Sequence, residues 1–233
     1  MLNTIGFATL MMTIMVNAVA VLTAMKLPRR EQLLAAAVAG AWVGIAAALA
    51  AAGALGFAPA QPVPVIGLLA GGPLVLAAGF WLGSANFRAI VTALPLPLLV
   101  GLHAMRLLGA LFLALAAVGR LSGPFPYFAG LGDVLTGALA IPLALRLAQG
   151  EQTPIGWWNL LGAVDLLLAV TLGITSAQGS PLQLFHGGAG SEAMQHLPFS
   201  LVPTVLVPYY LITHGIIAAK ITSRANAQTL AIA

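Results

Sequence analysis

Three charged side chains lie inside otherwise apolar stretches of the chain: Arg106, Asp133 and Asp165. An ionisable group at the centre of a membrane helix costs about 2.5–3.5 kcal/mol, so it marks a paired or functional site. Arg106 and Asp165 each lie about ten residues, or about 15 Å, from the same expected membrane face. Asp133 lies within reach of a long arginine. The spacing therefore predicts a buried ion-pair network among these three residues.

The charges of this network do not balance, because two carboxylates face one guanidinium. A bound proton or cation would neutralise the excess, which makes both carboxylates candidate proton carriers. Arg106 would anchor an anion or act as a gate, with Asp133 and Asp165 as its counter-ions. The alternative is that the three charges only hold helices together.

Two histidines lie near the network at similar depths on different helices. His103 precedes Arg106 by three residues and shares its helix face, and His214 lies about 9 Å inside the membrane. Such a pair suits ligation of a b-type haem, with Arg106 facing a propionate. The alternative is two ordinary interior histidines. Asn159 and Tyr210 complete the polar set, and Tyr210 shares a helix face with His214.

Glycines lie one helical turn from each charged residue. They are Gly109, Gly130, Gly137 and Gly162. Small residues either permit the close approach of two helices or leave room for a ligand, and the sequence leaves both interpretations open.

The run Gly-Leu-Gly-Asp at 130–133 resembles the GxGD motif of intramembrane aspartyl proteases such as presenilin and signal peptide peptidase. In those enzymes the partner aspartate precedes the motif in a Tyr-Asp pair. Here the candidate partner, Asp165, follows the motif and comes after Val164. Their later Pro-Ala-Leu motif has no counterpart in this chain. We therefore expect no protease activity.

The composition places these residues in a membrane. Hydrophobic residues make up 61% of the 233 residues and charged residues 6%, against about 25% charged residues in soluble domains. Nine basic and five acidic side chains could not cover a soluble globule of this size. The chain has no cysteine, which excludes disulfides, thiolate metal sites and iron–sulfur clusters. The basic residues are scattered rather than clustered, so no nucleic-acid partner is expected.

Seven apolar runs are long enough to cross a bilayer, which takes about 20 residues each. They cover residues 4–25, 33–57, 65–83, 94–118, 128–147, 155–176 and 199–219. The first lacks the basic start of a signal peptide and is too long for one, so we expect it to stay as a spanning helix. The predicted fold is all-α: one polytopic domain, 1–233, of seven transmembrane helices with a polar core in helices 4–7, about 94–221.

The basic residues predict the orientation. On one side of the predicted spans lie Lys26, Arg29, Arg30, Arg88, Arg146, Lys220 and Arg224. Only Arg120 lies in a loop on the other side, so the N-terminus is expected outside and the C-terminus in the cytoplasm. Trp81, Trp157 and Trp158 then fall at the inner interface, and Tyr127 at the outer one.

Two features of the last part of the chain are also predictable. The external loop 177–198 is the longest, and a loop of this length is either a functional lid or disordered. Pro203 and Pro208 lie five residues apart in the last span and are expected to kink it.

Three short runs carry a wider resemblance. Arg-Leu-Leu-Gly at 106–109, Gly-Asp at 132–133 and Asn-Leu-Leu-Gly-x-x-Asp at 159–165 resemble a family of bacterial seven-helix integral membrane proteins. The resemblance implies a seven-helix fold in the bacterial inner membrane and brings no activity with it.

The sequence favours an integral membrane protein that binds or translocates a small solute or protons through the polar core of helices 4–7, in contact with lipid and without a cofactor. Two alternatives stay open. One is a b-type haem protein that uses His103 and His214. The other is a non-catalytic membrane subunit or sensor whose buried charges are structural.

Overall fold

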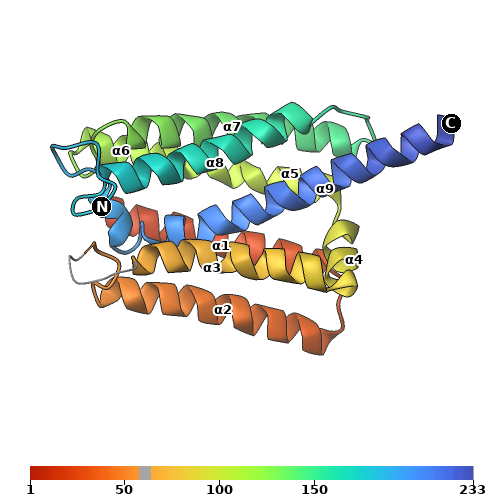
Figure 1. The fold of residues 1–233 in the computed structure, drawn as a ribbon, viewed down its shortest axis with the longest axis horizontal. Coiled ribbons are helices and arrows are strands. Elements are labelled where there is room, and N and C mark those ends of the chain that lie inside the picture. Colours follow the sequence, from red (N-terminus) through yellow and green to blue (C-terminus); the bar gives the residue numbers. More distant parts are fainter. Residues whose placement is uncertain (58–63, 233) are drawn as a thin grey trace.

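The computed structural model describes residues 1–57 and 64–232, and the side chains up to Ser223. Over this part of the chain all regular structure is helical, and seven helices are long and apolar enough to cross a membrane. Figure 1 shows them side by side in a bundle, with the N-terminus at one end and the C-terminus at the other. The predicted all-α class and the seven spans are confirmed.

Most elements follow the predicted spans closely, but the second helix covers 29–51 rather than 33–57 and the last continues to 232 rather than ending at 219. The seven spans are α1 (Leu2–Ala24), α2 (Arg29–Ala51), α3 (Val65–Gly83), the composite of α5 (Leu96–Leu102), η1 (His103–Gly109) and α6 (Ala110–Ala117), α7 (Phe125–Ala148), α8 (Gly156–Ser176), and η3 (Val202–Leu206) with α9 (Val207–Ile232). Two short elements were not predicted: α4 (Ala85–Ala93) and η2 (Glu192–Gln195). Helix α4 begins after Ser84, whose hydroxyl accepts the N–H of Phe87 at 3.1 Å as an N-cap.

Two spans depart from α-helical geometry, one in its middle and one at its start. Residues His103–Gly109 form a 3₁₀ helix between α5 and α6, and Val202–Leu206 form a π-helix before α9. The second distortion contains Pro203 and ends just before Pro208, because neither proline can donate a backbone hydrogen bond. The last span is therefore distorted by a π-helical turn beside its two prolines, and the kink expected there stays a prediction.

The helices differ strongly in how much of them is buried within the protein. In the most apolar 18 residues of each helix, only 11% of the residues of α2 and 6% of those of α3 are buried within the protein. The corresponding fractions are 44% for the α5–η1–α6 span and 50% for the last span. Exposed aliphatic side chains such as Val38 and Val75 cover the outer helices, as expected where a helix faces lipid. Most of the protein core therefore lies among α5–α9, and a smaller buried cluster joins α2, α3 and the start of the last span.

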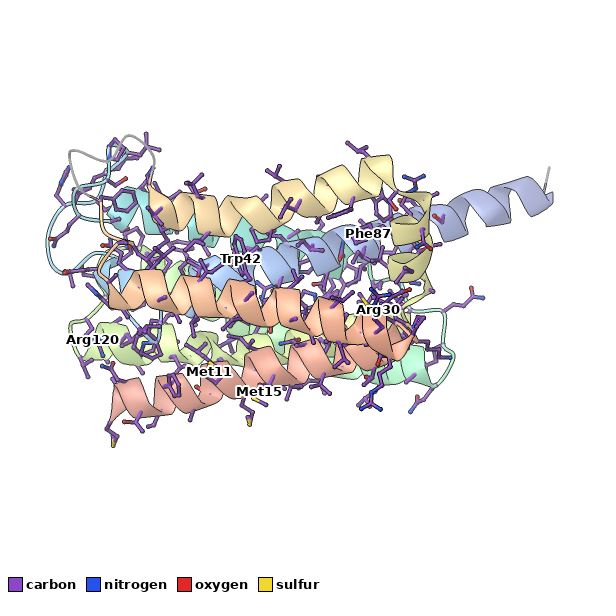
Figure 2. All side chains as sticks on the ribbon, turned by 90° about the horizontal axis from the view of Figure 1, so that it is seen from below. Met11, Met15, Arg30, Trp42, Phe87 and Arg120 are labelled. Carbon is purple, nitrogen blue, oxygen red and sulfur yellow. The ribbon has the colours of Figure 1, made fainter. Side chains whose placement is uncertain are left out.

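The two ends of the bundle differ in charge and in loop structure. Figure 2 shows Arg30 and Arg120 at opposite ends. Arg88 donates to the carbonyl of Trp81 at 2.5 Å, and Lys220 donates to the carbonyl of Thr92, so basic side chains satisfy helix C-termini at one end. The side chain of Arg224, which entered the charge count, lies outside the described residues.

The loop 177–198 is ordered and closes the other end of the bundle. The hydroxyl of Ser122 donates to the carbonyl of Gly187 at 3.0 Å and accepts the N–H of Gly190 at 2.7 Å. Met194 is only 5% exposed and packs into the core. The loop therefore packs on the bundle as a cap, defined here as residues 177–198.

Candidate functional site

All seven polar residues singled out from the sequence lie in one buried cluster, which we call the polar cluster. They are His103, Arg106, Asp133, Asn159, Asp165, Tyr210 and His214, and they come from η1, α7, α8 and α9. Residues as far apart in the chain as 103 and 214 are brought together because the four elements pack around one another. That these residues bind or carry anything stays a prediction.

Arg106 is the centre of the polar cluster. Its Nε donates to Oδ1 of Asp133 at 2.6 Å, and its Nη2 donates to Oδ2 of Asp165 at 2.5 Å. Its Nη1 donates to the carbonyl of Gly162 at 3.1 Å. The arginine side chain is only 1% exposed. The predicted buried ion pair is confirmed, and one guanidinium ties η1 to both α7 and α8.

His214 is held as a neutral imidazole by its partners. Nδ2 of Asn159 donates to the backbone carbonyl of His214 at 3.2 Å, which fixes the orientation of the amide because a carbonyl only accepts. The amide oxygen then faces Nδ1 of His214 at 2.8 Å, so Nδ1 carries the proton. Nε2 is left as the acceptor for Nη1 of Arg106, at 3.2 Å.

His103 lies against His214 and does not mirror its bonding. Thr213 donates its hydroxyl proton to the carbonyl of Tyr210 at 2.9 Å, so it accepts from Nε2 of His103 at 3.1 Å. Nδ1 of His103 has no hydrogen-bond partner among the described residues. The imidazole is fully buried.

The two histidines are close together, but their arrangement does not fit a haem. Their ring centroids are 4.2 Å apart, and both Nε2 atoms already contact protein groups, Thr213 and Arg106. A haem ligated by both rings needs its iron and macrocycle between two free ring nitrogens. The haem alternative would therefore require both rings to separate. Within the described residues no group of three or more metal-binding side chains is present.

The structure places further residues against the polar cluster that the sequence did not assign to it. Nδ2 of Asn17, on α1, donates to the hydroxyl of Tyr210 at 3.3 Å. Trp158 is fully buried, donates from Nε1 to the carbonyl of Thr136 at 3.1 Å, and packs edge-on against His103. Trp158 therefore lies inside the protein, in the first turn of α8, and its predicted depth at the membrane interface stays a prediction. The sequence could have pointed to Asn17, because it is the main polar residue in the first three spans.

The four glycines beside the charged residues permit close packing. A Cβ added to Gly137 would lie 2.8 Å from the backbone nitrogen of Leu107, and one on Gly162 would lie 2.6 Å from Cε1 of His214. A Cβ on Gly109 would meet the Cβ of Asp133, and one on Gly130 would meet the carbonyl of Gly109 at 3.0 Å. Of the two interpretations, the close approach of helices applies at these positions.

In contrast to these tightly packed glycines, Asp133 lies beside two cavities. A cavity of about 310 Å³ lies between α3, α6, α7, α8, α9 and the cap, and a second of about 30 Å³ borders Arg106 and Tyr210. Asp133 lines both cavities, and the smaller is large enough for a water molecule. Only Oδ1 of Asp133 is hydrogen-bonded within the described residues, and its side chain is 14% exposed. The polar cluster therefore meets the larger cavity at Asp133.

Comparison with known proteins gives a family and no activity. No curated protein and no solved structure matches the chain. Residues 63–221 match the family described as Domain of unknown function (DUF8737). The match covers more than half of the chain and includes every residue of the polar cluster, but neither α1 nor α2. The chain therefore belongs to the DUF8737 family.

Proposed function

We propose that this membrane protein binds a small solute or protons at the polar cluster and passes them across the bilayer. The observation that carries the proposal is the position of Asp133. One of its carboxylate oxygens pairs with Arg106, and the residue also lines two cavities. We place the protein in the bacterial inner membrane with its N-terminus outside, following the family resemblance and the distribution of basic residues.

The charge balance supports binding at Asp133. With His214 neutral and both aspartates ionised, the cluster of Arg106, Asp133 and Asp165 carries one uncompensated negative charge. An unpaired charge is costly in a low-dielectric interior, so a proton or cation at Asp133 would stabilise the cluster. Arg106 would keep Asp165 as its partner while Asp133 binds and releases that proton or cation. The cluster can thus change its net charge without leaving the arginine unpaired.

Access to the cluster differs between its two sides. The larger cavity lies on the side of the cap, whereas the fully buried side chains of Leu99, Trp158 and Ile217 pack on the opposite side. Passage across the bilayer would therefore need a rearrangement of the helices. The 3₁₀ segment η1 and the π segment η3 are suitable hinges, because their hydrogen bonds can shift to the α-helical pattern.

Proton flux into proteoliposomes tests this function. Vesicles loaded with the pH-sensitive dye pyranine are given an interior-negative potassium diffusion potential, and the acidification of the lumen is recorded. We expect faster acidification with the wild-type protein than in protein-free vesicles. Asp133→Asn should lower the rate to background, and Arg146→Gln, at the end of α7, should not. Equal rates in vesicles with and without the wild-type protein would contradict proton translocation.

A second candidate is a subunit or sensor in which the charges only hold the helices together. The observation in its favour is that Nε, Nη1 and Nη2 of Arg106 all donate hydrogen bonds within the protein. Under this alternative, replacing Arg106, Asp133 and Asp165 by leucine would cost little stability, and the proton flux into vesicles would be the same for the wild-type protein and the triple variant. Under the proposed function, the same triple variant would lose transport.

A further inference from the structure

The larger cavity is a long apolar space with one charged end. It extends from Ala177, just after α8, to Leu166 within it, about 16 Å, and reaches Asp133 at its inner end. Apart from Asp133, its polar lining residues are Ser191 and Gln195, both at the cap. The remaining lining side chains are aliphatic, aromatic, glycine, proline or methionine. Its occupant must therefore present mostly carbon surface to the protein.

Two glycines of α3 keep this space open. Gly67 and Gly71 lie one turn apart and both line the cavity, and a Cβ added to either would meet nothing within 4 Å. On the opposite wall, Leu167 of α8 is 57% exposed while it also lines the cavity. Since Gly67 is exposed too, the cavity is bordered by the lipid-facing surfaces of α3 and α8. A molecule dissolved in the bilayer can reach it from the side.

The charge at the inner end selects the kind of molecule. Asp133 belongs to a cluster with one excess negative charge, so a carboxylate or phosphate would be repelled there. A hydrated inorganic cation is also disfavoured, because it needs several oxygen ligands and the walls around Asp133 are apolar. An organic cation brings its own apolar body and needs only one charged partner. Asp133 can act as that partner.

We infer that the cavity binds an amphipathic amine, with the ammonium group on Asp133 and the apolar body between α3 and α8. This inference rests on the proposed function, since it names the class of solute that the polar cluster takes. The ammonium would supply the positive charge that Arg106 alone does not provide. The apolar body would be buried against Gly67, Gly71 and the aliphatic side chains of α8.

Direct binding measurements on the full chain in lipid nanodiscs test the inference. Radiolabelled decylamine is the probe, scintillation proximity is the signal, and empty nanodiscs give the background for partition into lipid. We expect saturable binding that unlabelled decylamine displaces. Decanol, which has the same tail without the charge, and decanoate, which has the opposite charge, should not displace it.

Three variants locate the site. Asp133→Asn should weaken binding by about thirtyfold or more, the usual effect of removing one partner of a buried charge pair. Gly71→Phe should abolish binding by filling the cavity. Gly79→Phe is the matched control on the same helix, because Gly79 also faces open space but does not line the cavity. Should Asp133→Asn fail to fold, the two phenylalanine variants still decide the question.

Each outcome supports or overturns the inference. Saturable binding that Gly71→Phe removes and Gly79→Phe keeps supports it. Binding no greater than that of empty nanodiscs, equal displacement by decanoate, or unchanged binding in Gly71→Phe overturns it. The proposed function fails separately: amine binding without proton flux contradicts translocation alone, and proton flux without amine binding contradicts this inference alone.

Discussion

The indole nitrogen of Trp42 donates a hydrogen bond of 3.0 Å to the backbone carbonyl of Thr204. Thr204 lies four residues before Pro208, so its carbonyl is the one that a helical N–H at position 208 would have satisfied. A residue of α2 therefore supplies, from another helix, the donor that the last span lacks. Figure 2 labels Trp42 on α2, an outer helix that is otherwise mostly exposed.

Removing this donor should weaken the protein measurably. Trp42→Phe keeps an aromatic ring and removes the N–H, so the carbonyl of Thr204 loses its partner in an apolar environment. We expect a loss of about 1–3 kcal/mol in the free energy of unfolding, measured by thermal or denaturant unfolding in detergent. Trp81→Phe is the control, because the indole of Trp81 makes no hydrogen bond within the described residues. An equal loss in both variants would contradict this role of Trp42.

The polar cluster makes a second prediction about stability. Arg106→Leu alone leaves two buried carboxylates without their partner and should cost about 3–5 kcal/mol of unfolding free energy. Because Arg106 pairs with both aspartates, Arg106→Leu combined with Asp133→Leu and Asp165→Leu should recover most of that loss. Unfolding of the single and triple variants by circular dichroism checks this. A triple variant less stable than the single variant would show that the charges are not coupled.

Gly132 makes a third prediction, about packing at Asp165. A Cβ at position 132 would fall on the carboxylate of Asp165, so Gly132→Ala must displace this carboxylate from Arg106. We expect a loss of about 1–3 kcal/mol. Gly215→Ala is the matched control in α9, since a Cβ there meets nothing within 4 Å and alanine favours the helix. Melting temperatures measured side by side should fall only for Gly132→Ala.

The orientation in the membrane is the fourth prediction. Seven basic residues on one side of the spans against one on the other predict a cytoplasmic C-terminus. A reporter fused after Ala233 should be active only if it is a type that works in the cytoplasm, such as a fluorescent protein. Activity of a periplasm-dependent alkaline phosphatase at the same position would reverse the orientation.

Much of the fold and the membership of the cluster follow from one physical fact: a polar group in a membrane must have a partner. The sequence therefore predicted the seven spans, and it singled out residues that the structure brings together. The 3₁₀ segment around Arg106 was not predictable, because hydrogen-bond register within a helix leaves no periodic signal. The burial of Trp158 within the protein was not predictable, since a tryptophan near the end of a span fits a membrane interface as well as a core. The cavity beside Asp133 depends on the spacing of α3 and α8, which only tertiary packing fixes.

The 3₁₀ segment His103–Gly109 also has a mechanical consequence. Its seven residues are about 3.5 Å longer than the same residues in an α-helix, and they are wound about 140° further. Conversion of this segment to α-helix would therefore be a screw motion that draws α5 and α6 together while turning one against the other. Arg106 lies in the middle of the screw, so its guanidinium would swing away from the facing carboxylates. A change of hydrogen-bond register inside one helix would thus loosen the ion pairs that join η1 to α7 and α8.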